Sequence, residues 1–87
     1  MYLAVTDVKP QKEYILLLTF ENEEKRLFDM KPYLNHGVFK ELKNINIFNT
    51  VKVNFDTIEW INEADFDPEA LYLNSTELKQ DIIEKEQ

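Results

Sequence analysis

The chain has 87 residues and a formal net charge of −7 at pH 7, and 44% of its residues are hydrophobic and 13% aromatic. This length fits one domain, and this share of large apolar side chains is enough for a single core. Because the chain has no cysteine, the composition excludes disulfides, thiolate metal sites and cysteine nucleophiles, and it favours a reducing compartment, the cytoplasm.

The first 28 residues predict a three-stranded antiparallel meander, with β-forming segments at 2–8, 13–20 and 24–28 separated by short turns. The second segment is the strongest strand, because large apolar side chains occupy both of its alternating faces. We therefore expect it to be the central strand. Its aliphatic run at 15–18 is far shorter than the roughly 20 residues that a membrane span needs, and the N-terminus does not have the pattern of a signal peptide.

The middle of the chain predicts short helices. Asp29 can cap a first helical turn, and Gly37, the only glycine, indicates a helix stop or a left-handed turn. A second short helix has the apolar spacing of one helical face, formed by Val38, Phe39 and Leu42. Further strands at 47–55 and 58–61 predict a second β-hairpin.

The C-terminal part predicts two helices. Asp67 followed by Pro68 indicates the start of a helix that runs to about residue 72, because an Asp cap and a proline at the first helical position favour initiation. Asn74 or Ser75 can cap a last helix, in which Glu77 completes a capping box with Asn74.

These elements predict an α+β fold: a three-stranded antiparallel meander, short helices, then a second β-hairpin and C-terminal helices. We expect a single domain at residues 1–74 and a C-terminal helical tail at residues 75–87. The tail can dock on the domain, pair with a second copy or fray. A homodimer is plausible through its apolar residues, which are Leu78, Ile82 and Ile83.

Acidic residues are concentrated in the second half of the chain. Between residues 53 and 78 there is no Lys or Arg, and the carboxylates are Asp56, Glu59, Glu63, Asp65, Asp67, Glu69 and Glu77. This stretch predicts a negative surface, which is either a solvated face that promotes solubility or a docking face for a basic protein. The acidity argues against direct binding of nucleic acid, whose phosphates need clustered Lys and Arg.

No residue pattern predicts a catalytic, cofactor or metal site. The single histidine, His36, is interpreted as an exposed loop residue, since no partner that would orient it for catalysis is evident. The alternation of Asp65, Asp67 and Glu69 resembles the start of a calcium loop, but the glycine that such a loop requires is absent. We therefore expect neither a metal nor a cofactor.

The order of several short motifs resembles a known family. They are Leu27-Phe28-Asp29, Gly37-Val38-Phe39 with Leu42, Phe48 with Val51 and Val53, Ile58-Glu59-Trp60, Ala64-Asp65-Phe66-Asp67-Pro68 and Leu71-Tyr72. Over about residues 1–74 this order resembles the bacterial domain-of-unknown-function family 2442. The resemblance implies a small α+β domain with no established activity. Some relatives look like partners of another small protein in a toxin–antitoxin-like pair.

We expect a non-enzymatic protein-interaction domain that presents an acidic surface, with a small basic protein of a toxin–antitoxin-like pair as one candidate partner. The candidate partner-binding residues are Glu63, Asp65 and Glu69. The alternative is a small-ligand sensor with a pocket near Trp60 and Tyr72, although rings in so small a domain more often fill the core. A third hypothesis, an enzyme that uses Asp65 and His36, has no further feature in its favour.

Overall fold

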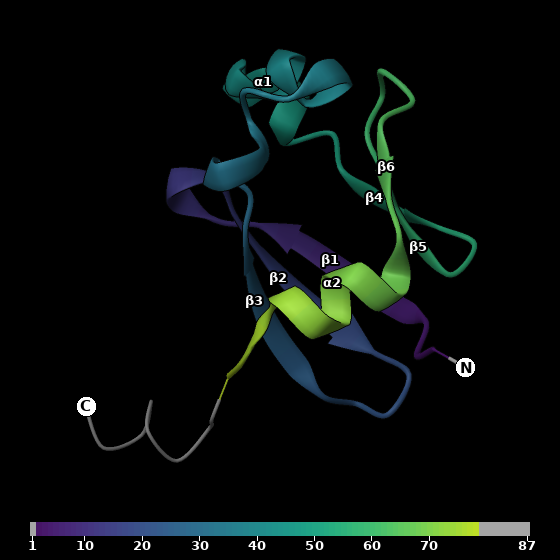
Figure 1. Ribbon diagram of the computed structural model, residues 1–87. Helices are drawn as coiled ribbons and strands as arrows, with labels where there is room; N and C mark the ends of the chain where they lie inside the picture. The colour runs from purple at the N-terminus through teal and green to yellow at the C-terminus, as the bar shows by residue number, and fades with distance from the viewer. Residues whose placement is uncertain (1, 79–87) are drawn as a thin grey trace.

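The computed structural model describes residues 2–78, which form two small antiparallel sheets joined by short helices (Figure 1). The larger sheet has the order β1-β2-β3-β7, with bounds Val5–Pro10, Ile15–Phe20, Lys25–Asp29 and Thr76–Glu77. The smaller sheet has the order β4-β5-β6, with bounds Lys52–Asn54, Thr57–Glu59 and Asp65–Phe66. The helices are α1 and α2, with bounds Ile45–Phe48 and Pro68–Asn74, and 3-10 segments lie at Lys12–Tyr14, Lys31–Tyr33 and Gly37–Lys43. The predicted α+β class is confirmed.

Strand β2 is central in the meander, as its sequence predicts. It pairs antiparallel with β1 on one side and β3 on the other, so that Leu18 lies between Val8 and Arg26. Leu16, Leu18 and Phe20 are completely buried on the face toward the core. The opposite face of β2 is half-buried and is formed by Ile15, Leu17 and Thr19.

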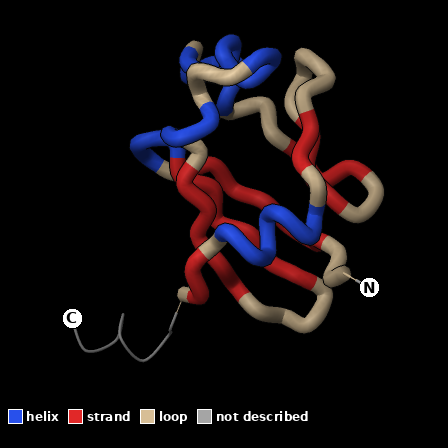
Figure 2. The backbone as a smooth tube through the Cα atoms, viewed as in Figure 1, coloured by secondary structure: helices blue, strands red, loops and turns tan. Residues whose placement is uncertain are grey.

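Helix α2 crosses the inner face of the larger sheet (Figures 1 and 2). It begins as the sequence predicts, because the Asp67 side chain accepts a hydrogen bond from the Ala70 amide at 3.0 Å and Pro68 occupies the first helical turn. Leu71 is completely buried beneath the helix. This burial anchors α2 and leaves its remaining face available at the surface.

Trp60 lies in the core, between the smaller sheet and the 3-10 and α1 segments. Its side chain is 1% exposed, and its indole nitrogen donates to the Phe48 carbonyl oxygen at 3.0 Å. The Phe39 ring meets it edge-on, with ring centroids 6.2 Å apart. Phe39 also stacks on Phe66 of β6, so one aromatic layer ties the second sheet to the middle of the chain.

The strand expected at residues 47–55 is wrong in its first half. Helix α1 covers Ile45–Phe48, and β4 begins only at Lys52. The Asn44 side chain accepts a hydrogen bond from the Asn46 amide at 3.0 Å and so caps the helix. A single helical turn buries Phe48 completely, whereas the apolar spacing of the sequence suits a strand equally well.

The helix expected from residue 74 or 75 is also wrong for the residues that the structure describes. Thr76 and Glu77 instead form β7, in which Thr76 pairs with Leu27 of β3. Without β7, the edge of β3 would leave backbone N–H and C=O groups unpaired at this position. Pairing with β7 gives these groups hydrogen-bond partners. The sheet therefore continues beyond the expected domain boundary at residue 74. Most of the helical tail expected at residues 75–87 lies outside the described residues, as do two of the apolar residues expected to form a homodimer, Ile82 and Ile83.

Smaller differences concern strand ends. Strand β1 runs to Pro10 rather than ending at residue 8. Strand β2 begins at Ile15 rather than residue 13, because Glu13 and Tyr14 have φ values of 60° and 63°, which a strand cannot accommodate. The short strand β6 has no counterpart in the expectation from sequence. It forms because Phe66 pairs with Ile58 of β5.

Candidate functional site

The exposed face of α2 carries a group of side chains at helical spacing. Glu69, Tyr72 and Leu73 are three and four residues apart, which places them on one face of the helix. Leu71 is buried on the other face. As a result Leu73 is 70% exposed, although it is a large apolar residue.

This face forms one wall of a surface pocket. The pocket has a volume of about 230 Å³ and is lined by Tyr2, Leu3, Glu69, Tyr72 and Leu73. Its other wall is the segment that precedes β1. The lining combines aromatic rings and aliphatic side chains with a single carboxylate.

The wall formed by residues 2 and 3 is held in place by contacts to distant parts of the chain. The Tyr2 hydroxyl donates to Asp56 Oδ2 at 2.7 Å, and the Val5 amide donates to the Asp56 carbonyl oxygen at 2.9 Å. The Ala4 amide donates to Glu21 Oε2 at 2.9 Å. Tyr2 remains 44% exposed despite these contacts. The segment before β1 is thus fixed between the β4–β5 hairpin and the β2–β3 hairpin.

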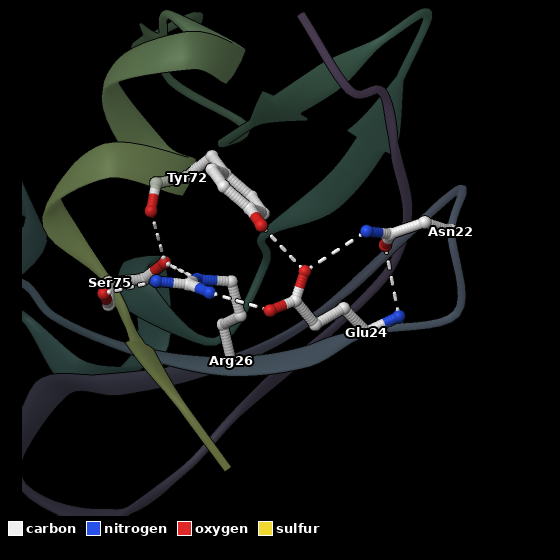
Figure 3. A network of polar contacts seen from close by, with 5 residues as sticks. All are labelled: Asn22, Glu24, Arg26, Tyr72 and Ser75. Carbon is white, nitrogen blue, oxygen red and sulfur yellow. Dashed lines mark hydrogen bonds and ion pairs between the residues drawn. The ribbon is translucent and has the colours of Figure 1, made fainter.

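The opposite wall is fixed by a polar network that joins α2 to β3 (Figure 3). The Tyr72 hydroxyl donates to Glu24 Oε1 at 2.7 Å, and Arg26 Nη1 donates to Glu24 Oε2 at 2.8 Å. The Arg26 guanidinium lies 4.3 Å from the centroid of the Tyr72 ring and donates to both the hydroxyl and the carbonyl oxygen of Ser75. Asn22 donates to the same Glu24 carboxylate at 3.0 Å.

This network determines the position of the Tyr72 ring. One side of the ring faces Arg26, and the ring meets Phe20 edge-on, with centroids 5.1 Å apart. A planar guanidinium that stacks on an aromatic ring and also pairs with a carboxylate is a geometry that Lys cannot reproduce. The Tyr72 side of the pocket is therefore formed before any ligand arrives.

The pKa shifts reflect the same contacts. The hydrogen bond to Asp56, followed by the charge of that carboxylate, raises the pKa of Tyr2. The hydrogen bond to Glu24 likewise raises the pKa of Tyr72, and the same bond from Tyr72 is the main cause of a lowered pKa at Glu24. Both hydroxyl groups consequently stay protonated, and the Glu24 carboxyl stays ionised, throughout the neutral range.

The electrostatic environment of the pocket is negative. The carboxylates of Asp56, Asp67 and Glu21 all act on Tyr2. Glu69 adds a further charge in the pocket lining. Arg26 acts on Tyr72 as a cation, but its guanidinium is paired with Glu24.

The β4–β5 turn, which holds Tyr2 through Asp56, also carries an exposed aromatic residue. Phe55 occupies the turn between β4 and β5, next to the Asp56 that holds Tyr2, and it is 90% exposed. Its φ of 56° is in the left-handed region, which bulky side chains rarely adopt. The β4–β5 hairpin, the N-terminal segment and the start of α2 lie on the same side of the molecule (Figure 1).

The structure divides the predicted site residues into two groups. Glu69 and Tyr72 lie together in the pocket lining, but Trp60 is in the core and does not line it. Glu63 and Asp65 are exposed, and the pocket contains neither. Glu63 lies in the β5–β6 turn with φ 71°, and Asp65 of β6 pairs with Glu59 of β5.

The prediction from sequence missed Tyr2, Leu3 and Leu73. The helical spacing of Leu73 relative to Glu69 was a usable signal. The contribution of residues 2 and 3 had no local signal, since Asp56 holds them from a position 54 residues away in sequence.

Further features of the described residues lie apart from this pocket or have no counterpart in it. A second pocket of about 340 Å³ lies between the β1–β2 connection and α1, lined by Pro10, Gln11, Lys12, Ile45 and Asn49. His36 is exposed, as expected. Within residues 2–78 no group of three His, Asp or Glu side chains could hold a metal ion. In the same range no helix has the length and apolar character needed to cross a bilayer.

Comparison with known proteins identifies the family of the chain but no individual relative. No curated protein and no solved structure matches it. The model of the family DUF2442, described as a protein of unknown function, matches residues 5–77. This match covers most of the chain and includes β1 through β7, so it confirms the resemblance seen in the sequence. The chain belongs to the DUF2442 family.

Proposed function

We propose that this chain is a non-enzymatic protein-interaction domain that docks a basic partner on the surface around α2. The observation that carries the proposal is the grouping of exposed apolar side chains with carboxylates. Tyr2 and Leu73 line the pocket together with Glu69 and are 44% and 70% exposed. Asp56 bonds to Tyr2, and the adjacent Phe55 is 90% exposed. Isolated exposed apolar residues are ordinary, but a group of them bordered by polar residues is typical of interaction surfaces.

The negative charge around the pocket indicates a positively charged partner. The carboxylates around the pocket form part of the stretch between residues 53 and 78 that has no Lys or Arg. A surface of this kind increases the rate of encounter with a positively charged protein and repels acidic ones. A small basic protein paired with this one in a toxin–antitoxin-like arrangement, in a bacterial cytoplasm, fits this description.

The positions of the three carboxylates in the structure support one of them more than the other two as a contact residue. Of the three carboxylates expected to bind the partner, Glu69 has the best support, because it lies in the pocket beside exposed apolar side chains. Glu63 and Asp65 precede α2 in the chain and remain secondary candidates.

The alternative, a small-ligand sensor, has weaker support. Tyr72 lines a pocket, but the pocket of about 230 Å³ is smaller than the roughly 300–1,000 Å³ typical of small-molecule sites. Trp60, the other candidate, is 1% exposed.

Affinity capture from cells that produce the chain tests the proposal. The bait proteins are the wild type, a charge-reversed Glu69→Lys variant and a matched Glu13→Lys control. Glu13 is exposed and precedes β2, whereas the pocket lies at the other end of β2, where Phe20 contacts the Tyr72 ring. A six-residue strand separates the two ends by about 20 Å.

We expect one basic protein to be retained by the wild type and by Glu13→Lys, and lost with Glu69→Lys. Retention should decrease as salt increases, since opposite charges at an exposed interface are screened. Equal retention by all three baits, or no retained protein at low salt, would contradict the proposal.

A further inference from the structure

The pocket beside α2 has the size of one side chain. Its volume is about 230 Å³. An apolar cavity of about 150 Å³ holds a benzene molecule, so this pocket accommodates a Phe or Leu side chain with some space at the opening. It is too small to enclose a typical metabolite.

The lining suits an apolar occupant. Leu3 and Leu73 contribute aliphatic surface, and the rings of Tyr2 and Tyr72 contribute aromatic surface. The polar ends of both tyrosines are already bonded, to Asp56 and Glu24. Filling the pocket with an apolar side chain would therefore leave neither hydroxyl group without a partner.

The pocket is also preformed. The buried Leu71 and the Arg26 network hold α2 against the larger sheet, and Asp56 holds Tyr2. Binding of an occupant would therefore not require the loss of conformational entropy that ordering these walls would cost. Such preorganisation favours affinity.

The charges around the opening limit what can bring that side chain. Glu69 lines the pocket, and Asp56, Asp67 and Glu21 are the other charged groups that act on Tyr2. A second copy of this chain, with its own net charge of −7, would place like charges opposite one another, which is unfavourable. Phosphate-bearing ligands are disfavoured for the same reason.

From the volume, the lining and the charges, we infer that this pocket binds a single large apolar side chain carried by a basic peptide segment, whose flanking Lys or Arg residues pair with Glu69 and Asp56. This inference rests on the proposed function and specifies its partner. An anchor of this type in a fully desolvated pocket commonly dominates the affinity of an interface.

Selection from a library of short random peptides displayed on phage tests the inference without knowledge of the natural partner. The immobilised protein is the wild-type chain, and enriched peptides are synthesised and titrated. Leu73→Ser and Glu69→Lys are the pocket variants. Ile61→Ser and Glu13→Lys are matched controls, because Ile61 is 71% exposed in the β5–β6 turn, close to the 70% of Leu73, and does not line the pocket.

We expect the enriched peptides to share one large apolar residue flanked by Lys or Arg. Their affinity should fall roughly tenfold or more for each pocket variant and stay unchanged for both controls. Because Leu73 is exposed, Leu73→Ser should fold normally, which denaturation followed by Trp60 fluorescence verifies.

Three outcomes would overturn the inference: no enrichment, enrichment of peptides without this pattern, or equal loss of affinity in pocket variants and controls. The proposed function and the pocket inference can be distinguished by experiment. If affinity capture yields a basic partner whose retention depends on Glu69 but not on Leu73, the interaction surface is supported and the pocket is not.

Discussion

Replacing Phe55 with Asn should stabilise the protein. Phe55 has a φ of 56°, and the left-handed region costs a non-glycine residue about 1–2 kcal/mol. Asn adopts this region more readily than most residues, because its short polar side chain bonds to the local backbone. Because Phe55 is 90% exposed, the substitution sacrifices almost no buried apolar surface.

The expected gain is about 1 kcal/mol in the free energy of unfolding, since Asn relieves part of the strain. For a domain of 60–100 residues this gain raises the melting temperature by about 4–8 °C. Trp60 is the only tryptophan and is 1% exposed, so its fluorescence reports unfolding in urea. The midpoint should increase while the slope with denaturant stays constant.

The control variant is Phe55→Ala, which removes the exposed ring but keeps the Cβ atom responsible for the strain. We expect it to leave stability nearly unchanged. If Phe55→Ala stabilises the protein as much as Phe55→Asn does, hydration of the ring rather than backbone strain explains the effect, and the reasoning is refuted. The same conclusion follows if Phe55→Asn is destabilising.

Substitutions at three further positions address other parts of the fold. Leu71→Ala should destabilise the protein by about 2–5 kcal/mol in urea denaturation, because Leu71 is completely buried under α2; a loss below 1 kcal/mol would contradict the anchoring role. Gly37→Ala should cost about 1 kcal/mol through its φ of 50° alone, since an added Cβ would meet no atom within 4 Å; Gly37→Asn should cost less. The lowered pKa of Glu24 means that its stabilisation is present above the unfolded value of about 4.5 and is lost as the pH falls through the lower folded value. Glu24→Gln should therefore show a shallower loss of stability in acid, and an unchanged slope would contradict the Glu24 network.

The elements that the sequence predicts correctly depend on local patterns. The apolar side chains on both faces of β2 are sufficient to identify it as the central strand, because a strand has a period of two whatever it pairs with. The Asp67-Pro68 pair likewise specifies the start of α2, because the cap bond is formed within four residues. The core position of Trp60 follows from the shortage of large apolar residues in a domain of this size.

The errors arise where two conformations satisfy the local pattern. The alternation of Val51, Val53 and Phe55 suits a strand, but the short apolar run that ends at Phe48 suits a strand or a helical turn, and the burial of Phe48 favours the turn. Thr76 and Glu77 can begin a helix or extend a sheet. The free edge of β3 favours the sheet, and no local sequence signal reveals that edge.

Some properties of the candidate site also follow from local sequence, whereas others depend on the fold. The sequence by itself determines that Glu69 and Tyr72 share a helix face and that the surrounding stretch is acidic, because both properties depend on near neighbours. Only the tertiary structure brings Tyr2 to that face, through a hydrogen bond to Asp56 that joins residues 54 positions apart, and orients Tyr72 through Glu24 in the β2–β3 turn. Contacts across such separations depend on how the whole chain packs, so a pocket built from them cannot be recognised before the fold is known.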